Sequence, residues 1–318
     1  MKRFSIGTSI GDGFGLVTGR PLSVFVWGLL VLAPTFGSVA LIFPMMGEIF
    51  ANMPAAGAEP EGYSPFNDQT FTGMMQFQLA SALLNVGHLA IIAIVYTAIF
   101  RAVLRPAERG FFSLRVGMDE LRVAVVGLVI GVVLYIAMIV LVLVGAALVF
   151  ALWSSDPVAG AWALGGYGLL VLLGICWVMA RVSMMAPASV LYRDFAFTQG
   201  WRLAAGKAWP LFGMMLLILL MILAIELVLA LIGVAGLSGV WAASGMAWAA
   251  EANPFPGLND WLAANWYWIV IGVVALSFFY GMVLTLAVGP FASACRQLAD
   301  SGEGGDAAVE EGSPVRAQ

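Results

Sequence analysis

Charged residues are scarce in this 318-residue chain: Asp, Glu, Lys and Arg together make up 10% of it, against 62% hydrophobic residues. So little charge excludes an ordinary soluble domain and is typical of a protein embedded in a lipid bilayer. The 14 basic residues are scattered in short clusters, whereas a nucleic-acid-binding protein gathers them on one face. We therefore expect membrane lipids, and not nucleic acid, as partners.

Cysteine and histidine are nearly absent as well, with two cysteines and one histidine in the whole chain. Cys176 lies within one apolar run and Cys295 near the end of another, a placement that favours neither a disulfide nor a metal site. The polar residues also offer no convergent acid, base or nucleophile. We therefore expect no metal or other cofactor, and we expect that the chain is not an enzyme.

The chain is rich in long apolar runs, and among those given below only 161–192 contains a Lys or Arg residue, Arg181. A hydrocarbon core of about 30 Å needs roughly 20 apolar residues as a helix. Six runs reach that length: residues 22–45, 75–100, 123–152, 161–192, 210–240 and 265–292. The sequence thus predicts an all-α integral membrane protein with six transmembrane helices.

The basic residues fall on alternate sides of these spans. They precede span one, separate spans two and three as well as spans four and five, and follow span six, whereas loops 46–74, 153–160 and 241–264 hold no Lys or Arg. By the positive-inside rule both termini are cytoplasmic. The tail at 301–318 is rich in Gly and acidic residues without an apolar face, so we expect it to be disordered.

A weak internal repeat divides the chain into three. Segments 4–17, 111–121 and 195–208 carry apolar residues at helical spacing and precede the odd-numbered spans. Near its start each has a similar pair: FS at 4–5, FS at 112–113 and FT at 197–198. We expect a single domain over 1–300, built from three units (about 1–105, 106–193 and 194–300) of an interfacial helix plus a transmembrane hairpin. Units of equal polarity give approximate threefold symmetry along the membrane normal. Inverted repeats of three plus three spans are the alternative.

Part of the chain resembles a known family. Arg181, Pro187 six residues later, and WRLAAGKAWPL at 201–211 are similar to the membrane domain of bacterial glycerophosphoryl diester phosphodiesterases and to related six-span proteins that lack the catalytic domain. The likeness covers about residues 175–220. It implies a six-span protein of the bacterial inner membrane. It implies no activity, because the family's chemistry belongs to a separate soluble domain with paired histidines and metal-binding carboxylates, and His88 stands alone here.

Arg181 lies among apolar residues, in CWVMARVSMMAP. In a continuous helix it would be about 18 Å from Arg193, near the middle of the bilayer, where an unpaired arginine is costly. Glu226 is the only acid within the predicted spans, and His88 falls in the same layer. We predict that Arg181 pairs with Glu226, with His88 close by. The alternative is that Pro187 breaks span four and Arg181 reaches the headgroups.

A polar face on span two completes the candidate sites: Gln78, Ser81, Asn85 and His88 recur every three or four residues. Hydrogen bonds between helices explain such a face better than a substrate path does. We therefore expect a non-catalytic membrane protein that binds lipid, another membrane protein or itself, in an accessory or regulatory role. The alternative is a small transporter or channel that uses this polar face. Glycines in spans three and five, among them Gly127 and Gly131, are predicted sites of close helix contact.

Overall fold

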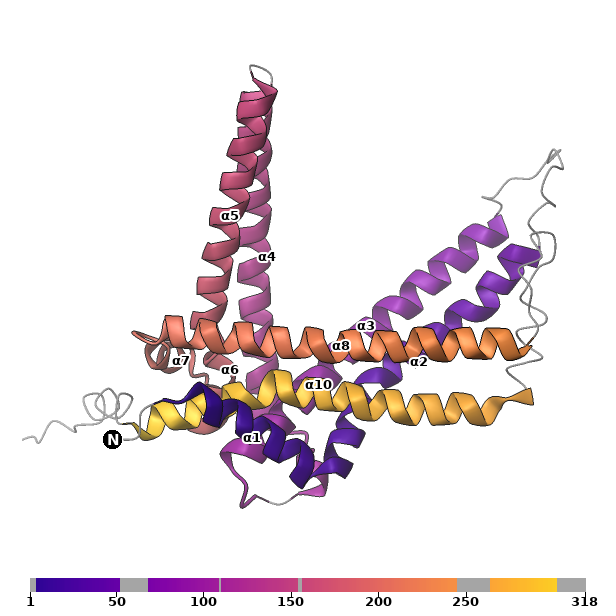
Figure 1. Ribbon diagram of the computed structural model, residues 1–318, viewed down its shortest axis with the longest axis horizontal. Coiled ribbons are helices and arrows are strands. Elements are labelled where there is room, and N and C mark those ends of the chain that lie inside the picture. Colours follow the sequence, from indigo (N-terminus) through magenta and orange to yellow (C-terminus); the bar gives the residue numbers. More distant parts are fainter. Residues whose placement is uncertain (1–3, 52–67, 109, 154–155, 245–263, 302–318) are drawn as a thin grey trace, which may run out of the picture. The chain divides into compact units, whose positions relative to one another are not determined.

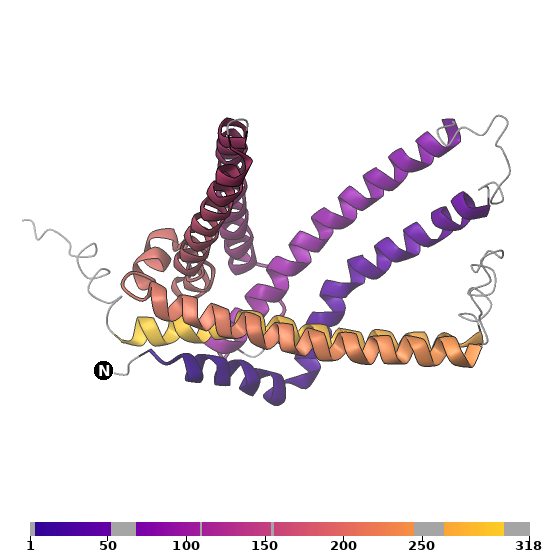
Figure 2. The same cartoon turned by 45° about the horizontal axis from the view of Figure 1, so that its top comes forward.

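The computed structural model describes residues 4–51, 68–108, 110–153, 156–244 and 264–301, and this part of the chain contains helices and no strand (Figure 1; Figure 2). The predicted tail, from residue 302, lies outside the described residues. The helices are α1 (Ile6–Gly19), α2 (Pro21–Ala51), α3 (Asp68–Leu104), the 3₁₀ turn η1 (Phe111–Ser113), α4 (Met118–Trp153), α5 (Pro157–Val182), α6 (Met185–Tyr192), α7 (Phe197–Leu203), α8 (Ala208–Ser244) and α10 (Trp266–Asp300).

The prediction of six membrane spans is confirmed. Six helices or helix pairs are long and apolar enough to cross a bilayer: Pro21–Val39, Phe71–Leu104, Met118–Trp153, Pro157–Tyr192, Ala208–Gly236 and Trp266–Asp300. Backbone groups have no water partners in hydrocarbon, so a helix, which satisfies them internally, is the structure that apolar runs of this length adopt. The chain is a multi-pass membrane protein.

Span four is not a continuous helix. α5 ends at Val182, and α6 begins at Met185 after a turn at Ser183 and Met184. Pro187 is the cause, because it has no N–H to donate to the carbonyl of Ser183 and its ring would clash with that carbonyl. The break of span four near Pro187 is confirmed, and the premise of a continuous helix from Arg181 to Arg193 is wrong. That Arg181 reaches the headgroups stays a prediction.

Of the three predicted short helices, two are present and one is wrong. α1 and α7 form within segments 4–17 and 195–208. Segment 111–121 is no helix of its own: η1 holds Phe112 and Ser113 at positive φ (51° and 57°), and Met118 already begins α4. The apolar residues at helical spacing therefore do not form a separate helix here, and a tight turn leads directly into the third span.

The chain folds into two compact units. The first comprises residues 1–19, 96–221 and 285–318, and the second comprises 20–95 and 222–284. Large side chains without solvent exposure form the centre of the first unit: Ile99, Met184, Leu211, Leu286 and Leu298. In the hairpin of α4 and α5 that belongs to this unit, most side chains face outward, as expected of helices surrounded by lipid.

In the second unit, α2 and α10 touch backbone to backbone. A methyl group added at Gly28 would overlap the carbonyl oxygen of Ser277, and one added at Gly281 would overlap that of Val24. Such contacts are typical of membrane helices, because small residues let backbones approach closely. The close contacts predicted at Gly127 and Gly131 are not found, because a methyl group added at either glycine would have no described neighbour within 4 Å.

Candidate functional site

Arg181 lies in the last turn of α5, beside two indole rings that contact each other edge to face. Its guanidinium carbon is 4.8 Å from the ring centre of Trp201 on α7 and 5.3 Å from that of Trp177. One terminal nitrogen also donates to the carbonyl oxygen of Trp201, at 3.5 Å. Arg181 is about 36 Å along α5 from Pro157, at 1.5 Å per residue, a distance longer than the roughly 30 Å thickness of a hydrocarbon core.

The partners predicted for Arg181 belong to the other compact unit. His88 and Glu226 lie in the second unit, Arg181 in the first, and their pairing stays a prediction. The polar face of α3 is in the second unit too. There Ser81 and His88 are half-buried, whereas Gln78 and Asn85 are exposed. Its role in helix packing or in transport also stays a prediction.

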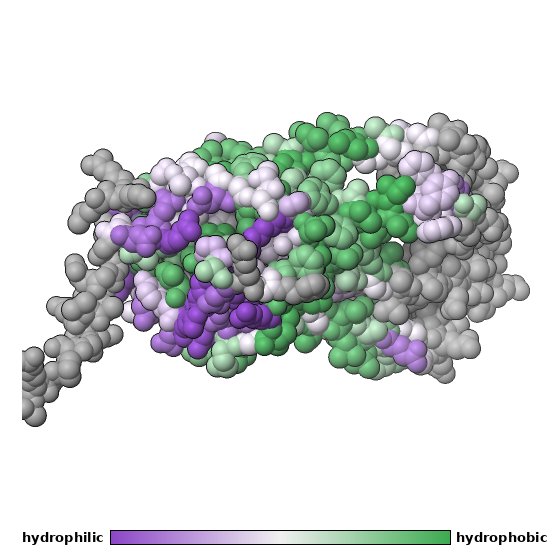
Figure 3. Space-filling model, turned by 90° about the horizontal axis from the view of Figure 1, so that it is seen from below, coloured by the Kyte–Doolittle hydropathy of each residue, from purple (hydrophilic) through white to green (hydrophobic). Residues whose placement is uncertain are grey.

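A charged pocket in the first unit is the main site that the sequence did not single out. It has a volume of about 310 Å³ and lies where α3 and α6 end and α4 begins. Its ionisable lining residues are Arg101, Arg105, Glu108, Arg115, Asp119, Glu120, Arg122 and Arg193. These five arginines and three carboxylates leave two positive charges in excess. Figure 3 shows hydrophilic residues gathered in one region of the face seen from below.

Arg101 connects the end of α3 to the turn before α4. Its side chain is 3% exposed, one nitrogen donates to the carbonyl oxygen of Ser113 at 2.8 Å, and the other donates to Oε1 of Glu120 at 2.5 Å. A buried guanidinium needs such bonds, since its desolvation is otherwise uncompensated. The bond to Ser113 also fixes the backbone at the two residues of positive φ, Phe112 and Ser113.

Asp119 joins three arginines around the pocket. Its carboxylate accepts hydrogen bonds from Arg105 at 3.1 Å and from Arg122 at 3.0 Å, and it lies 3.7 Å from Arg101. Arg105 also donates to the carbonyl oxygen of Val190, which ties the end of α3 to α6. These bonds make the pocket wall a connected network, which holds its groups in one arrangement.

The chain turns at Arg193, another residue of the pocket wall. This residue is in the left-handed conformation (φ 56°) at the end of α6, and its guanidinium pairs with Glu108 at 2.6 Å. Positive φ costs a non-glycine residue roughly 1 to 2 kcal/mol. Of the three non-glycine residues with positive φ in the described part of the chain, Arg193 lines the charged pocket and Ser113 accepts a hydrogen bond from Arg101 of its wall. Strained residues often lie near sites of function.

Several polar groups of the pocket remain unpaired. Oε2 of Glu120 and Nε of Arg122 are buried and have no hydrogen-bond partner in the described part of the protein. Arg115 is exposed and forms no ion pair with a described residue. The first turn of α4 adds N–H groups and the positive end of the helix dipole. Chemically, the pocket can bind an anion and offers one acceptor beside it.

A second polar connection in the first unit fastens α1 to α10. Asp12 accepts hydrogen bonds from Ser293 at 2.5 Å and from Arg296 at 3.2 Å, and Gln297 donates to the hydroxyl of Ser9 at 3.1 Å. Gly13 faces the ring of Pro290. These contacts place the short helix α1 against the end of the last span.

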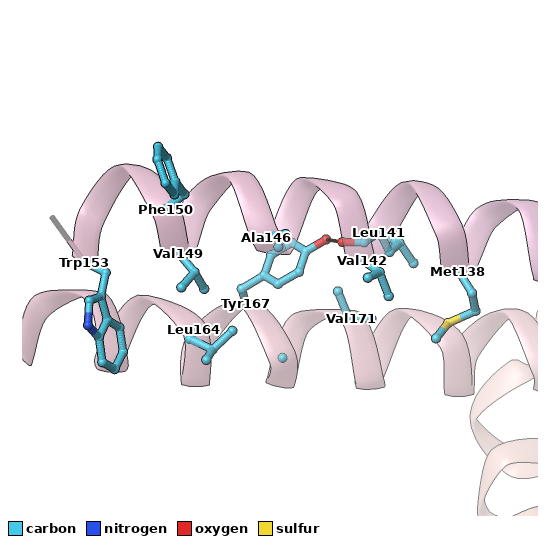
Figure 4. A pocket seen from close by; sticks show the side chains of 12 residues that line it. Met138, Leu141, Val142, Ala146, Val149, Phe150, Trp153, Leu164, Tyr167 and Val171 are labelled. Atoms are coloured by element: carbon cyan, nitrogen blue, oxygen red, sulfur yellow. Dashed lines mark hydrogen bonds between the residues drawn. The ribbon is translucent and has the colours of Figure 1, made fainter. Parts of the chain in front are cut away.

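An apolar groove of about 880 Å³ runs between α4 and α5 (Figure 4). Tyr167 extends from α5 across it and donates its hydroxyl to the carbonyl oxygen of Leu141, at 2.6 Å. The edge of the same ring packs against Gly145 of α4. The tyrosine hydroxyl is thereby satisfied within the hairpin, and the rest of the groove presents hydrocarbon to the lipid.

The sequence contained a signal for the charged pocket. Asp119 and Glu120 lie just after Gly117 and Met118, in a stretch that has five arginines between residues 101 and 122, although such bases are normally interpreted as topology determinants. Comparison with known proteins adds no assignment, since no family model, no curated protein and no solved structure matches the chain.

Proposed function

We propose that this chain is a non-catalytic protein of the bacterial inner membrane that binds the phosphate of phospholipid headgroups in the charged pocket. The observation that carries the proposal is the excess of guanidinium groups over carboxylates in a pocket at the ends of membrane-spanning helices. Guanidinium groups bind phosphate oxygens with charge-assisted, often bidentate, hydrogen bonds. Both termini and the pocket face the cytoplasm in this proposal, because the bases lie on that side.

The pocket also suits an accessory or regulatory role towards another membrane protein or a second copy. Its wall is formed by the ends of three helices and the segment before α4, so a bound headgroup would change the stability of all of them together. The resemblance to the membrane domain of glycerophosphoryl diester phosphodiesterases agrees with a module that serves a partner and performs no chemistry itself.

Matching ion pairs support the threefold repeat that we propose as the architecture. Asp12 lies eight residues after Phe4 of the first FS, and Glu120 lies eight residues after Phe112 of the second. Each accepts a hydrogen bond from an arginine near the end of a hairpin: Asp12 from Arg296 of the last hairpin, and Glu120 from Arg101 of the first.

The third position of this series departs from the pattern. Eight residues after Phe197 the chain has Ala205, which offers no carboxylate. The corresponding arginine, Arg193, pairs instead with Glu108. The three arginines thus have corresponding positions in the proposed repeat. Arg296 and Arg101 bind the acid eight residues after an FS pair, and Arg193, for which that acid is absent, binds Glu108.

Lipid retention tests the proposed function. The full chain, purified in mild detergent from a mixture of phospholipids, should keep bound phospholipid that native mass spectrometry detects. Arg115→Ala removes a guanidinium that makes no ion pair with a described residue, so it should lower lipid affinity about tenfold without unfolding the protein. The control is Arg202→Ala, an exposed base on α7 outside the pocket. Equal retention by Arg115→Ala and the wild type contradicts the proposal.

A further inference from the structure

The charged pocket contains an acceptor that a simple anion would leave unpaired. Glu120 is 5% exposed, and its Oε1 is occupied by Arg101, at 2.5 Å. Glu120 is one of the residues that line the pocket, and its buried Oε2 has no hydrogen-bond partner in the part of the chain that the structure describes. A buried carboxylate oxygen in this state requires a donor from outside the protein.

A donor in the same pocket is also unpaired, and it needs a hydrogen-bond acceptor. Nε of Arg122 is buried without a partner, although Nη1 of the same side chain is held by Asp119 at 3.0 Å. Together with Arg115 it can bind phosphate oxygens. A ligand that satisfies both unpaired groups therefore carries a phosphate and, a short distance from it, a hydrogen-bond donor.

We propose that the ligand of the charged pocket is a phosphoethanolamine headgroup, whose phosphate binds Arg122 and Arg115 and whose primary ammonium donates to Oε2 of Glu120. This inference rests on the proposed function, since it specifies the headgroup of the lipid bound there. An ammonium suits the position better than a hydroxyl, because a hydrogen bond between two charged groups is stronger than one with a neutral donor.

The size and place of the pocket agree with this ligand. Its volume of about 310 Å³ is in the range of small-ligand sites. Phosphoethanolamine can reach a protein as a lipid headgroup or as a soluble compound. We assign the lipid, because the pocket is formed by the ends of α3 and α4, two membrane-spanning helices, where headgroups are concentrated.

A series of lipids that differ by single methyl groups tests the donor without any mutation. The full chain in detergent is titrated with phosphatidylethanolamine, its N-methyl and N,N-dimethyl forms and phosphatidylcholine, all with the same acyl chains, and affinities are measured by native mass spectrometry. The phosphate is constant while the N–H donors disappear. We expect affinity to fall along the series, with phosphatidylcholine at least tenfold weaker than phosphatidylethanolamine.

Glu120→Gln should abolish this preference, so that the two end members bind within about twofold of each other. The control is Asp12→Asn, which changes the corresponding acid of α1, bound to Arg296 outside the pocket, and should leave the preference intact. If Glu120→Gln does not fold, the methyl series on the wild type decides alone.

The remaining outcomes separate the two proposals. If phosphatidylethanolamine and phosphatidylcholine bind equally, and both more weakly to Arg115→Ala, the phosphate site stands and the ammonium assignment fails. If Arg115→Ala changes neither, the proposed function itself fails. Phosphatidylglycerol binding as tightly as phosphatidylethanolamine overturns the choice of ammonium over hydroxyl. Soluble phosphoethanolamine binding as tightly as the lipid overturns the choice of source, since we expect it to be at least tenfold weaker.

Discussion

Arg181 has partners in its own compact unit that explain how an arginine is tolerated in an apolar stretch. The rings of Trp177 and Trp201 form an edge-to-face pair beside its guanidinium group, and a cation near an indole face is stabilised electrostatically. Trp177 and Trp201 are themselves 46% and 37% exposed, so the cluster lies at the surface of the helices, where indoles commonly anchor a membrane boundary.

A pair of double-mutant cycles distinguishes this explanation from the predicted ion pair. For Arg181→Met combined with Trp201→Leu we expect a coupling of about 1 kcal/mol in the free energy of unfolding, because the contact between the cation and the indole ring is lost in either single variant. The same cycle with Glu226→Gln tests the pairing with Glu226. Unfolding is measured in the same detergent for all variants.

Each cycle has its own decisive result. If the effects of Arg181→Met and Trp201→Leu simply add, the indole contact does not stabilise Arg181. If the effects of Arg181→Met and Glu226→Gln add, the two residues do not form the ion pair predicted from the sequence.

At the scale of helices, the closest contact in the second unit is the crossing of α2 and α10. There the backbone of Gly28 lies against the backbone at Ser277, and Gly281 lies against Val24. Hydrocarbon chains of lipid are as apolar as leucine, so membrane helices associate through close packing more than through a hydrophobic driving force. The crossing is therefore sensitive to a single methyl group.

Gly28→Ala should lower the free energy of unfolding by about 1 to 3 kcal/mol, because the added methyl group would overlap the carbonyl oxygen of Ser277 and force the helices apart. The measurement is thermal or denaturant unfolding of the protein in detergent. Gly127→Ala is the matched control: a methyl group there meets nothing within 4 Å, and we expect a change within about 0.5 kcal/mol. Gly28→Ala as stable as the control would show that the two backbones are not in contact in the membrane.

The helices themselves were predictable, whereas their local breaks were only partly so. Hydropathy sets the length of a span, which is why all six apolar runs became helices. The break after α5 could be predicted from Pro187, since a proline interrupts the helix formed by the residues just before it. The turn at Phe112 and Ser113 could not be predicted from segment 111–121, because it is held by Arg101, a residue of the preceding helix.

The charged pocket escaped prediction for a related reason. Its residues come from segments 101–122 and 193, and they look like ordinary positive-inside charges until their hydrogen bonds are known. Pairing between Arg101 and Glu120 depends on the geometry of a turn, and no spacing rule for helices gives it. The residues that the sequence did single out, His88, Arg181 and Glu226, stood out by polarity alone, which marks a position as costly without identifying its partner.

At the scale of the whole molecule, the distribution of basic residues predicts one topology. Reporter fusions after residues 60, 157 and 255 should lie outside, and a fusion after residue 310 inside, because the segments between spans alternate between basic and base-free. Alkaline phosphatase and fluorescent-protein fusions measure the two sides. A cytoplasmic signal from the fusion at residue 255 would contradict the six-span arrangement.

The attachment of α1 to α10 has a consequence for biosynthesis. Asp12 is separated from Ser293 by 281 positions and from Arg296 by 284, so α1 leaves the ribosome roughly 15 to 60 s before its partners at 5 to 20 residues per second. During that interval the hydroxyl of Ser9 and the carboxylate of Asp12 lack the bonds that fasten the helix. A nascent chain interrupted before Arg296 would thus carry an unattached amphipathic segment that membrane proteases can cleave. The first unit can complete its contacts only after the last span has been synthesised.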